Sequence, residues 1–94
     1  MKHITASENW LFEIKEVRAM RTKSYGAPYS AIVRLIIVNG ELSIDGLMFK
    51  ENEAGTIADM REIENFITKT LGFNEYSYDR YKNGEKTKKK KVIK

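Results

Sequence analysis

Hydrophobic and polar positions alternate most regularly between residues 29 and 49. Two β-rich runs, 29–38 and 41–49, flank the dipeptide Asn39-Gly40. Asn and Gly tolerate the positive φ angles that a two-residue type I′ turn requires, so the pattern predicts an antiparallel hairpin. The turn also sets the register. The expected pairs are Ile37 with Leu42, Leu35 with Ile44, Arg34 with Asp45 and Ile32 with Leu47.

The two faces of this hairpin differ in their predicted surroundings. The expected core face carries Ala31, Val33, Leu35, Ile37, Leu42, Ile44 and Met48. The opposite face carries an Arg34–Asp45 cross-strand pair among four large apolar residues, Ile32, Ile36, Leu47 and Phe49. A face this apolar is expected to be partly covered, by the helix, by a long loop or by a second subunit. These four residues are therefore a candidate protein interface.

The segment 9–20 fits two structures. Trp10 and Ile14 belong to a strand-like alternation that slips by one residue at Lys15-Glu16, which a β-bulge would explain. Trp10, Ile14 and Val17 also share one face of a possible helix. We favour the strand and keep the helix as the alternative.

An amphipathic helix is predicted over residues 56–71. Thr56 precedes Asp59 by three residues, close to a capping-box pattern, and Gly72 stands where a left-handed residue ends a helix. The apolar stripe consists of Met60, Ile63, Ile67 and Leu71, widened by Ile57 and Phe66. This stripe is expected to pack on the core face of the sheet, and Phe73 to fold back on Ile67.

A second Asn-Gly pair, Asn83-Gly84, predicts a C-terminal hairpin of residues 75–82 and 85–93. Its expected pairs are Lys82 with Glu85, Asp79 with Lys88, Tyr78 with Lys89 and Tyr76 with Lys91. The fold class is thus α+β in a single domain, residues 1–94. It has an antiparallel β-meander (about 9–20, 29–38 and 41–49), one helix (56–71) packed on the sheet, and this hairpin or tail (74–94).

The positive charge of the chain is concentrated in this C-terminal segment. Residues 1–73 carry nine Lys or Arg and ten Asp or Glu, whereas residues 74–94 carry eight and three. This asymmetry indicates an anionic partner.

The candidate nucleic-acid-binding residues combine cations, which neutralise phosphates, with tyrosines, which stack on bases; single-stranded or structured RNA suits such a face best. They are Tyr76, Tyr78, Arg80, Lys82, Lys88, Lys89, Lys90 and Lys91. Two alternatives stay open. The tyrosines can pack in the core beneath lysine stems, and the lysines can serve to protect an edge strand from aggregation.

The chain has few residues suited to catalysis or metal binding. The chain has no cysteine and one histidine, His3, which is expected to be a bystander near a mobile terminus. The glycines stand singly, so no phosphate-binding loop is predicted. We expect no catalytic residues, metal, cofactor or small-molecule ligand. The apolar runs are too short for a membrane partner, and a cytoplasmic location is expected.

The sequence therefore predicts a small, non-enzymatic binding protein that contacts nucleic acid through its basic, aromatic C-terminal hairpin. The alternative is a protein–protein interaction module, or a small inhibitor of a macromolecular partner, that docks through the apolar second face of its sheet. In that alternative the same face can form a homodimer.

Overall fold

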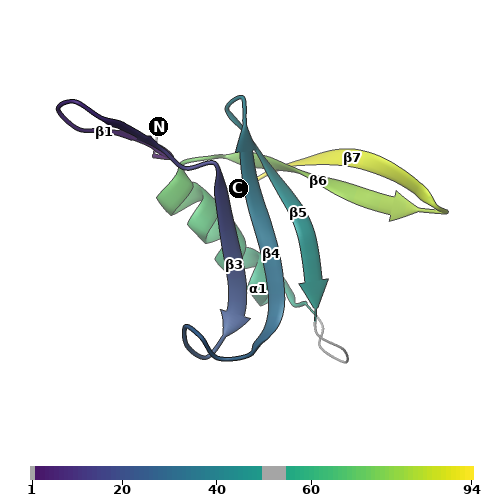
Figure 1. The fold of residues 1–94 in the computed structure, drawn as a ribbon. Helices are drawn as coiled ribbons and strands as arrows, with labels where there is room; N and C mark the ends of the chain where they lie inside the picture. Colours follow the sequence, from purple (N-terminus) through teal and green to yellow (C-terminus); the bar gives the residue numbers. More distant parts are fainter. Residues whose placement is uncertain (1, 50–54) are drawn as a thin grey trace.

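The computed structural model describes residues 2–49 and 55–94 (Figure 1). In chain order the elements are β1 Ile4–Ala6, β2 Leu11–Glu13, β3 Glu16–Thr22, β4 Tyr29–Val38, β5 Glu41–Phe49, α1 Ile57–Phe66, the π-helix η1 Ile67–Leu71, β6 Glu75–Lys82 and β7 Glu85–Val92. In the described part, five strands form one sheet in the order β3-β4-β5-β6-β7, and β1 pairs with β2 in a separate two-stranded sheet. The α+β class, the meander and the C-terminal hairpin are confirmed.

The β4–β5 hairpin turns at Asn39 and Gly40, whose φ angles of 52° and 76° suit the predicted type I′ turn. Near the turn the register is as predicted, with Leu35 opposite Ile44. Farther from the turn it is not, because a bulge in β5 contains Gly46 at φ 63°.

The bulge corrects two predictions. Ile32 lies opposite Met48 and not opposite Leu47. Residues that face each other in an antiparallel pair share one side of the sheet, so Met48 lies with Ile32, outside the core face where we expected it. Accordingly, 62 % of Met48 is exposed.

The segment 9–20 is extended, as favoured, but it forms two strands in different sheets. β2 pairs with β1, whereas β3 pairs with β4. The chain changes sheets at Ile14 and Lys15, where the Ile14 amide donates to the His3 carbonyl and the Lys15 carbonyl accepts from the Ile37 amide. The slip in alternation therefore marks a change of sheet and not a bulge.

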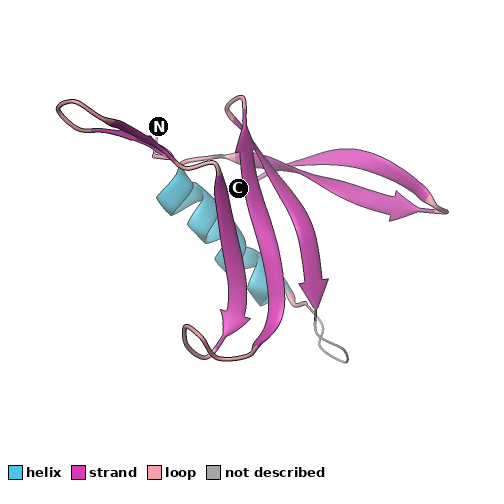
Figure 2. Cartoon of the chain, in the orientation of Figure 1, coloured by secondary structure: helices cyan, strands magenta, loops and turns pink. Residues whose placement is uncertain are grey.

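The helix begins with a complete capping box. Thr56 Oγ1 accepts from the Asp59 amide, and Asp59 Oδ2 accepts from the Thr56 amide. The helix continues from α1 into η1 and ends at Gly72, which is left-handed at φ 77°. Both helical segments lie on one side of the sheet (Figure 2). The predicted start and end of the helix are thus correct.

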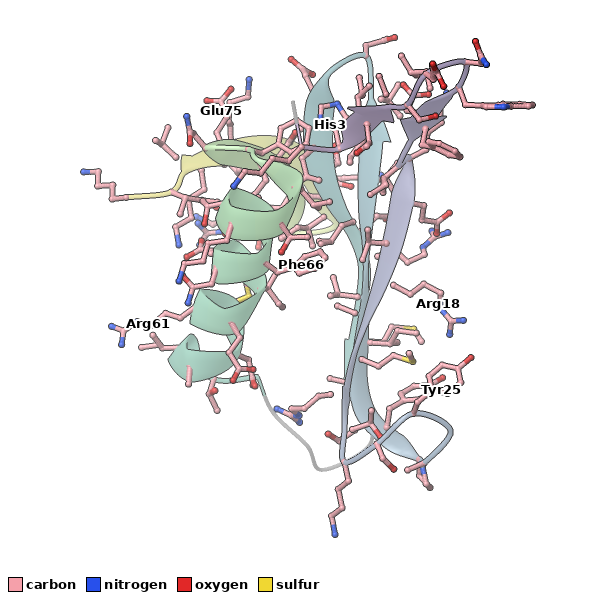
Figure 3. The ribbon with its side chains drawn as sticks, turned by 90° about the vertical axis from the view of Figure 1, so that its left-hand side faces the viewer. His3, Arg18, Tyr25, Arg61, Phe66 and Glu75 are labelled. Carbon is pink, nitrogen blue, oxygen red and sulfur yellow. The ribbon has the colours of Figure 1, made fainter. Side chains whose placement is uncertain are left out.

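The core lies where η1 meets the sheet. Its fully buried side chains are Leu35, Leu42, Ile67 and Leu71. Along the described span 57–66, by contrast, no residue of α1 is buried. Figure 3 shows α1 standing beside the sheet, with Phe66 directed toward the sheet and Arg61 away from it. The helix therefore packs tightly through its C-terminal half only, and Ile63 is half-buried.

His3 is not the mobile bystander that we expected. It is 4 % exposed, and its ring centroid lies 4.7 Å from that of Phe73. The expected return of the chain after Gly72 occurs, since the Phe73 amide donates to the Ile67 carbonyl. His3 thus anchors the N-terminal hairpin on the end of the helix.

Candidate nucleic-acid interface

The strands β6 and β7 form a two-stranded ribbon that extends away from the body of the sheet (Figure 1). The ribbon is paired along its length in the predicted register, and its turn uses Asn83 and Gly84 at φ 53° and 77°. Its attachment to β5 is a parallel pairing that covers Ser77 and Tyr78, with Ser77 opposite Ser43. Beyond Tyr78 the two strands of the ribbon pair only with each other in the described structure.

The inner end of the ribbon holds Tyr76, which is 3 % exposed. Its hydroxyl donates to Glu64 Oε2 on α1 at 2.7 Å, and its ring packs at 6.1 Å from that of Tyr78. Burial is the main cause that raises the pKa of Tyr76, and the hydrogen bond to Glu64 adds to it. A ring in this position cannot stack on a base without leaving the core. The structure therefore removes Tyr76 from the candidate interface.

Two of the predicted lysines have acidic partners within the chain. Lys91 Nζ lies 2.7 Å from Glu64 Oε2, and Lys90 Nζ lies 3.4 Å from Glu75 and 4.0 Å from Glu41. Burial tends to raise the pKa of Glu64, but the hydrogen bonds from Lys91 and Tyr76 outweigh it, so this pKa lies below its usual range. Lys91 thus serves to anchor the ribbon on the helix.

The outer half of the ribbon holds the cations available to a partner. Arg80, Lys82, Lys88 and Lys89 are exposed and form no ion pair with any residue that the structure describes. By register, Arg80, Lys82 and Lys89 lie on the same face as Tyr78, and Lys88 lies on the other. Between them, Lys86 pairs with Asp79 at 3.3 Å. We call the segment Asp79–Lys89 the outer ribbon; it presents positive charge on both faces.

The candidate protein interface on the other side of the sheet is only partly described. Ile32 and Ile36 are half-buried, and the side chains of Leu47 and Phe49 lie outside the described part of the structure. Register places Met20, Ile32 and Met48 in one row across three strands. Met20 is 38 % exposed. Met20 and Met48 therefore add to the apolar surface of this face, although sequence reasoning did not assign them to it.

Sequence reasoning also missed a groove between the sheet and α1, with a volume of about 880 Å³. Its sheet wall includes Val17, Ala19, Ala31 and Val33, and its helix wall includes Met60, Ile63 and Phe66. The small side chains of the alanines leave room beneath the helix. A sequence signal for the groove existed, because Ala19 and Ala31 stand where larger residues would fill a core.

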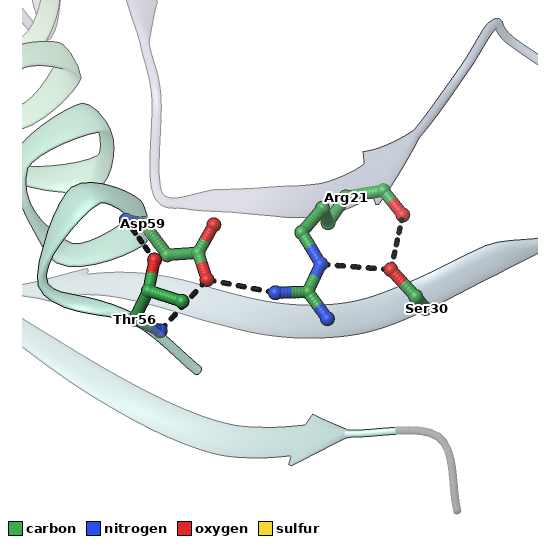
Figure 4. Close-up of polar contacts among 4 residues, drawn as sticks. All are labelled: Arg21, Ser30, Thr56 and Asp59. Atoms are coloured by element: carbon green, nitrogen blue, oxygen red, sulfur yellow. Dashed lines mark hydrogen bonds and ion pairs between the residues drawn. The ribbon is translucent and has the colours of Figure 1, made fainter. Parts of the chain in front are cut away.

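A polar cluster joins the groove walls at the N-terminus of α1 (Figure 4). Arg21 Nη1 lies 2.7 Å from Asp59 Oδ2, and Arg21 Nε donates to Ser30 Oγ at 2.7 Å. The hydrogen bond from the Thr56 amide is the main cause that lowers the pKa of Asp59, and the charge of Arg21 lowers it further. Asp59, which belongs to the capping box of α1, is thereby joined to the edge strand β3 through Arg21.

Comparison with protein-family models, with curated proteins and with solved structures finds no match. Across the described residues, no group of three or more His, Asp and Glu side chains could hold a metal ion. Nor does any helix in residues 2–49 and 55–94 have the length and apolarity needed to cross a membrane.

Proposed function

We propose that this chain is a non-enzymatic nucleic-acid-binding protein whose outer ribbon contacts the phosphate backbone. The observation that carries the proposal is the projection of Arg80, Lys82, Lys88 and Lys89 away from the body without acidic partners in the described residues. Residues 1–73 carry a small net negative charge, which repels phosphates. Cations that project away from the body can approach phosphates without this repulsion.

The ribbon favours duplex DNA over the single strands that the sequence suggested. Single-strand binding depends on aromatic rings free to stack, and Tyr76 is buried while Tyr78 is half-buried. The major groove of B-DNA, by contrast, admits a two-stranded β-ribbon. Cations on both ribbon faces would then lie near the two phosphate backbones that border the groove.

Fluorescence anisotropy with labelled duplex DNA, single-stranded DNA and RNA at several salt concentrations tests this proposal. We expect duplex DNA to bind best, with a slope of log affinity against log salt of roughly −0.9 per phosphate contact, or about −3 to −4 for four contacts. The absence of binding at micromolar protein in low salt would overturn the proposal.

The matched variants remove equal charge from different places. Replacing Arg80, Lys82, Lys88 and Lys89 by Gln should weaken binding by roughly 100-fold or more at low salt and flatten the slope. The control replaces the same number of cations on the body by Gln, namely Lys15, Lys23, Arg61 and Lys69, and should retain most of the affinity. Equal losses in the two variants would indicate a net-charge effect and contradict a ribbon site.

The second candidate function is a protein-interaction module that uses the opposite side of the sheet. It is favoured by the row of Met20, Ile32 and Met48, because methionine side chains adapt to varied apolar partners. A contact through this row would persist at high salt, whereas phosphate contacts would not. Met48→Ser should weaken such a contact and leave DNA affinity unchanged.

A further inference from the structure

The N-terminal hairpin β1–β2 exposes three consecutive large apolar residues. Trp10, Leu11 and Phe12 are 72 %, 65 % and 57 % exposed. The hairpin is nevertheless an ordered part of the fold, since Thr5 pairs with Phe12 in its ladder and buried His3 holds its base. Exposing this much apolar surface is costly in water, and such patches mark sites of association.

The groove beneath α1 is an apolar surface of matching character. An amphipathic helix is stabilised by burying its apolar stripe, yet Met60, Ile63 and Phe66 line a space that the described residues leave unfilled. Two charged lining residues have partners in the described structure, Arg21 with Asp59 and Lys91 with Glu64, and Arg18 and Glu62 also line the groove. Most of the lining side chains are apolar, so the groove suits an apolar occupant.

The strand between these two features has an open edge. β3 is one edge of the five-stranded sheet, and β7 is the other. β7 carries the lysine run, which protects an edge against pairing, whereas Glu16–Thr22 contains neither lysine nor proline. Because the Lys15 carbonyl accepts from Ile37 of β4, the backbone groups of alternate residues Glu16, Arg18 and Met20 point to the open edge.

The order of these features along β3 points to one partner. The apolar hairpin immediately precedes the N-terminal end of β3, and the groove reaches its C-terminal end at Arg21 and Asp59. Antiparallel pairing of two β3 strands places the N-terminal end of each beside the C-terminal end of the other. We propose that two copies of this chain associate through β3 across a two-fold axis, with Trp10, Leu11 and Phe12 of each copy seated in the groove of the other.

The area involved is that of a stable dimer. The exposed parts of one tryptophan, one leucine and one phenylalanine amount to roughly 300 Å², because a whole aromatic side chain buries about 150–250 Å². The groove wall contributes a similar area, and the two-fold axis doubles both, which gives about 1,200 Å² before the strands are counted. A single self-association thus covers the hairpin and the groove together.

The only tryptophan of the chain makes the test direct. Sedimentation equilibrium and Trp10 fluorescence are measured over one dilution series of the full chain. We expect a monomer–dimer equilibrium in which the emission maximum moves to shorter wavelength on association, with the same midpoint in both measurements. A monomer at every concentration, an open-ended series of oligomers, or a dimer in which Trp10 keeps the emission of a solvated indole would each overturn the proposal.

Two variants, each with a matched control, separate the hairpin from the edge. Phe12→Ser keeps the reporter and should raise the dissociation constant roughly 10- to 100-fold, whereas Val92→Ser, which changes an equally exposed apolar residue on β7, should not. Arg18→Pro removes a donor that points to the open edge and should also dissociate the dimer, while Arg18→Thr keeps the donor and the dimer. Circular dichroism and the denaturation midpoint show that each variant is folded, and a folded Phe12→Ser variant that still dimerises would contradict the proposal.

Discussion

The two hairpins that project from this fold, β1–β2 and β6–β7, have the same architecture and opposite surfaces. Both are antiparallel, and both are held at the base by one buried ring, His3 for the first and Tyr76 for the second. The N-terminal hairpin exposes tryptophan, leucine and phenylalanine, whereas the outer ribbon exposes arginine and lysines.

This difference follows from what a hairpin can hide. A two-stranded ribbon has no second layer, so each outward side chain is either hydrated or covered by a partner. The lysines of β7 are stable in water, and an anionic partner is optional for folding. The apolar N-terminal hairpin gains free energy only when it is covered. The comparison therefore predicts that association through β1–β2 stabilises the fold more than association through β6–β7 does.

The largest expected effect concerns the base of the ribbon. Tyr76→Ala should lower the free energy of unfolding by about 3–5 kcal/mol, because it removes a buried aromatic ring from the core. Tyr76→Phe keeps the ring and removes the hydrogen bond to Glu64, which should cost about 1.5–3 kcal/mol. Urea denaturation measures both. Full stability in Tyr76→Ala, accompanied by lost DNA affinity, would instead return Tyr76 to the binding surface.

The next effect concerns the base of the N-terminal hairpin. His3→Ala removes the ring packed against Phe73 and should cost about 1–3 kcal/mol, whereas His3→Phe, which restores a ring, should stay within about 1.5 kcal/mol of the wild type. Hydrogen exchange localises the loss, because the Ile14 amide donates to the His3 carbonyl and reports on the hairpin base. Unchanged protection of the Ile14 amide in His3→Ala would show that the ring does not anchor the hairpin.

The features that could be predicted from sequence depend on local conformation. Asn39-Gly40 and Asn83-Gly84 determine their turns through the φ angles they tolerate, and the registers next to both turns are correct. The helix start was predictable because the Thr56 capping box is also local. The bulge had a local signal too, since an isolated glycine inside a strand, here Gly46, is typical of one.

The features that were missed depend on contacts between distant segments. Alternation shows that Tyr76 and Lys91 share a ribbon face, but it does not show that a short parallel pairing of Ser77 and Tyr78 with β5 turns the base of that face toward the helix. The groove is of the same kind, because the space beneath α1 depends on how far the helix stands from the sheet. The exposure of the cations in the outer ribbon does not depend on contacts between distant segments, so the lysine run was sufficient to predict it.

The smallest expected effect is a pH dependence of the stability of the fold, caused by the ionisation of Glu64 at the base of the ribbon. Its pKa in the folded chain lies below the ordinary value of 4.5, so its interactions stabilise the fold above that value, and this stabilisation is lost as the pH falls through the folded pKa. The contribution of the charge should be about 1 kcal/mol, less than the cost of Tyr76→Phe, because Glu64→Gln keeps an acceptor for the Tyr76 hydroxyl. Glu64→Gln should therefore be less stable than the wild type at pH 7, and the difference should shrink as the solution is made more acidic than pH 4.5.

The control is Glu62→Gln, a change on the same helix at an exposed position, which should follow the wild-type curve throughout. Denaturation midpoints measured from pH 7 into this acidic range provide the check, and curves for the wild type and Glu64→Gln that stay parallel would show that the carboxylate does not hold the ribbon against the helix.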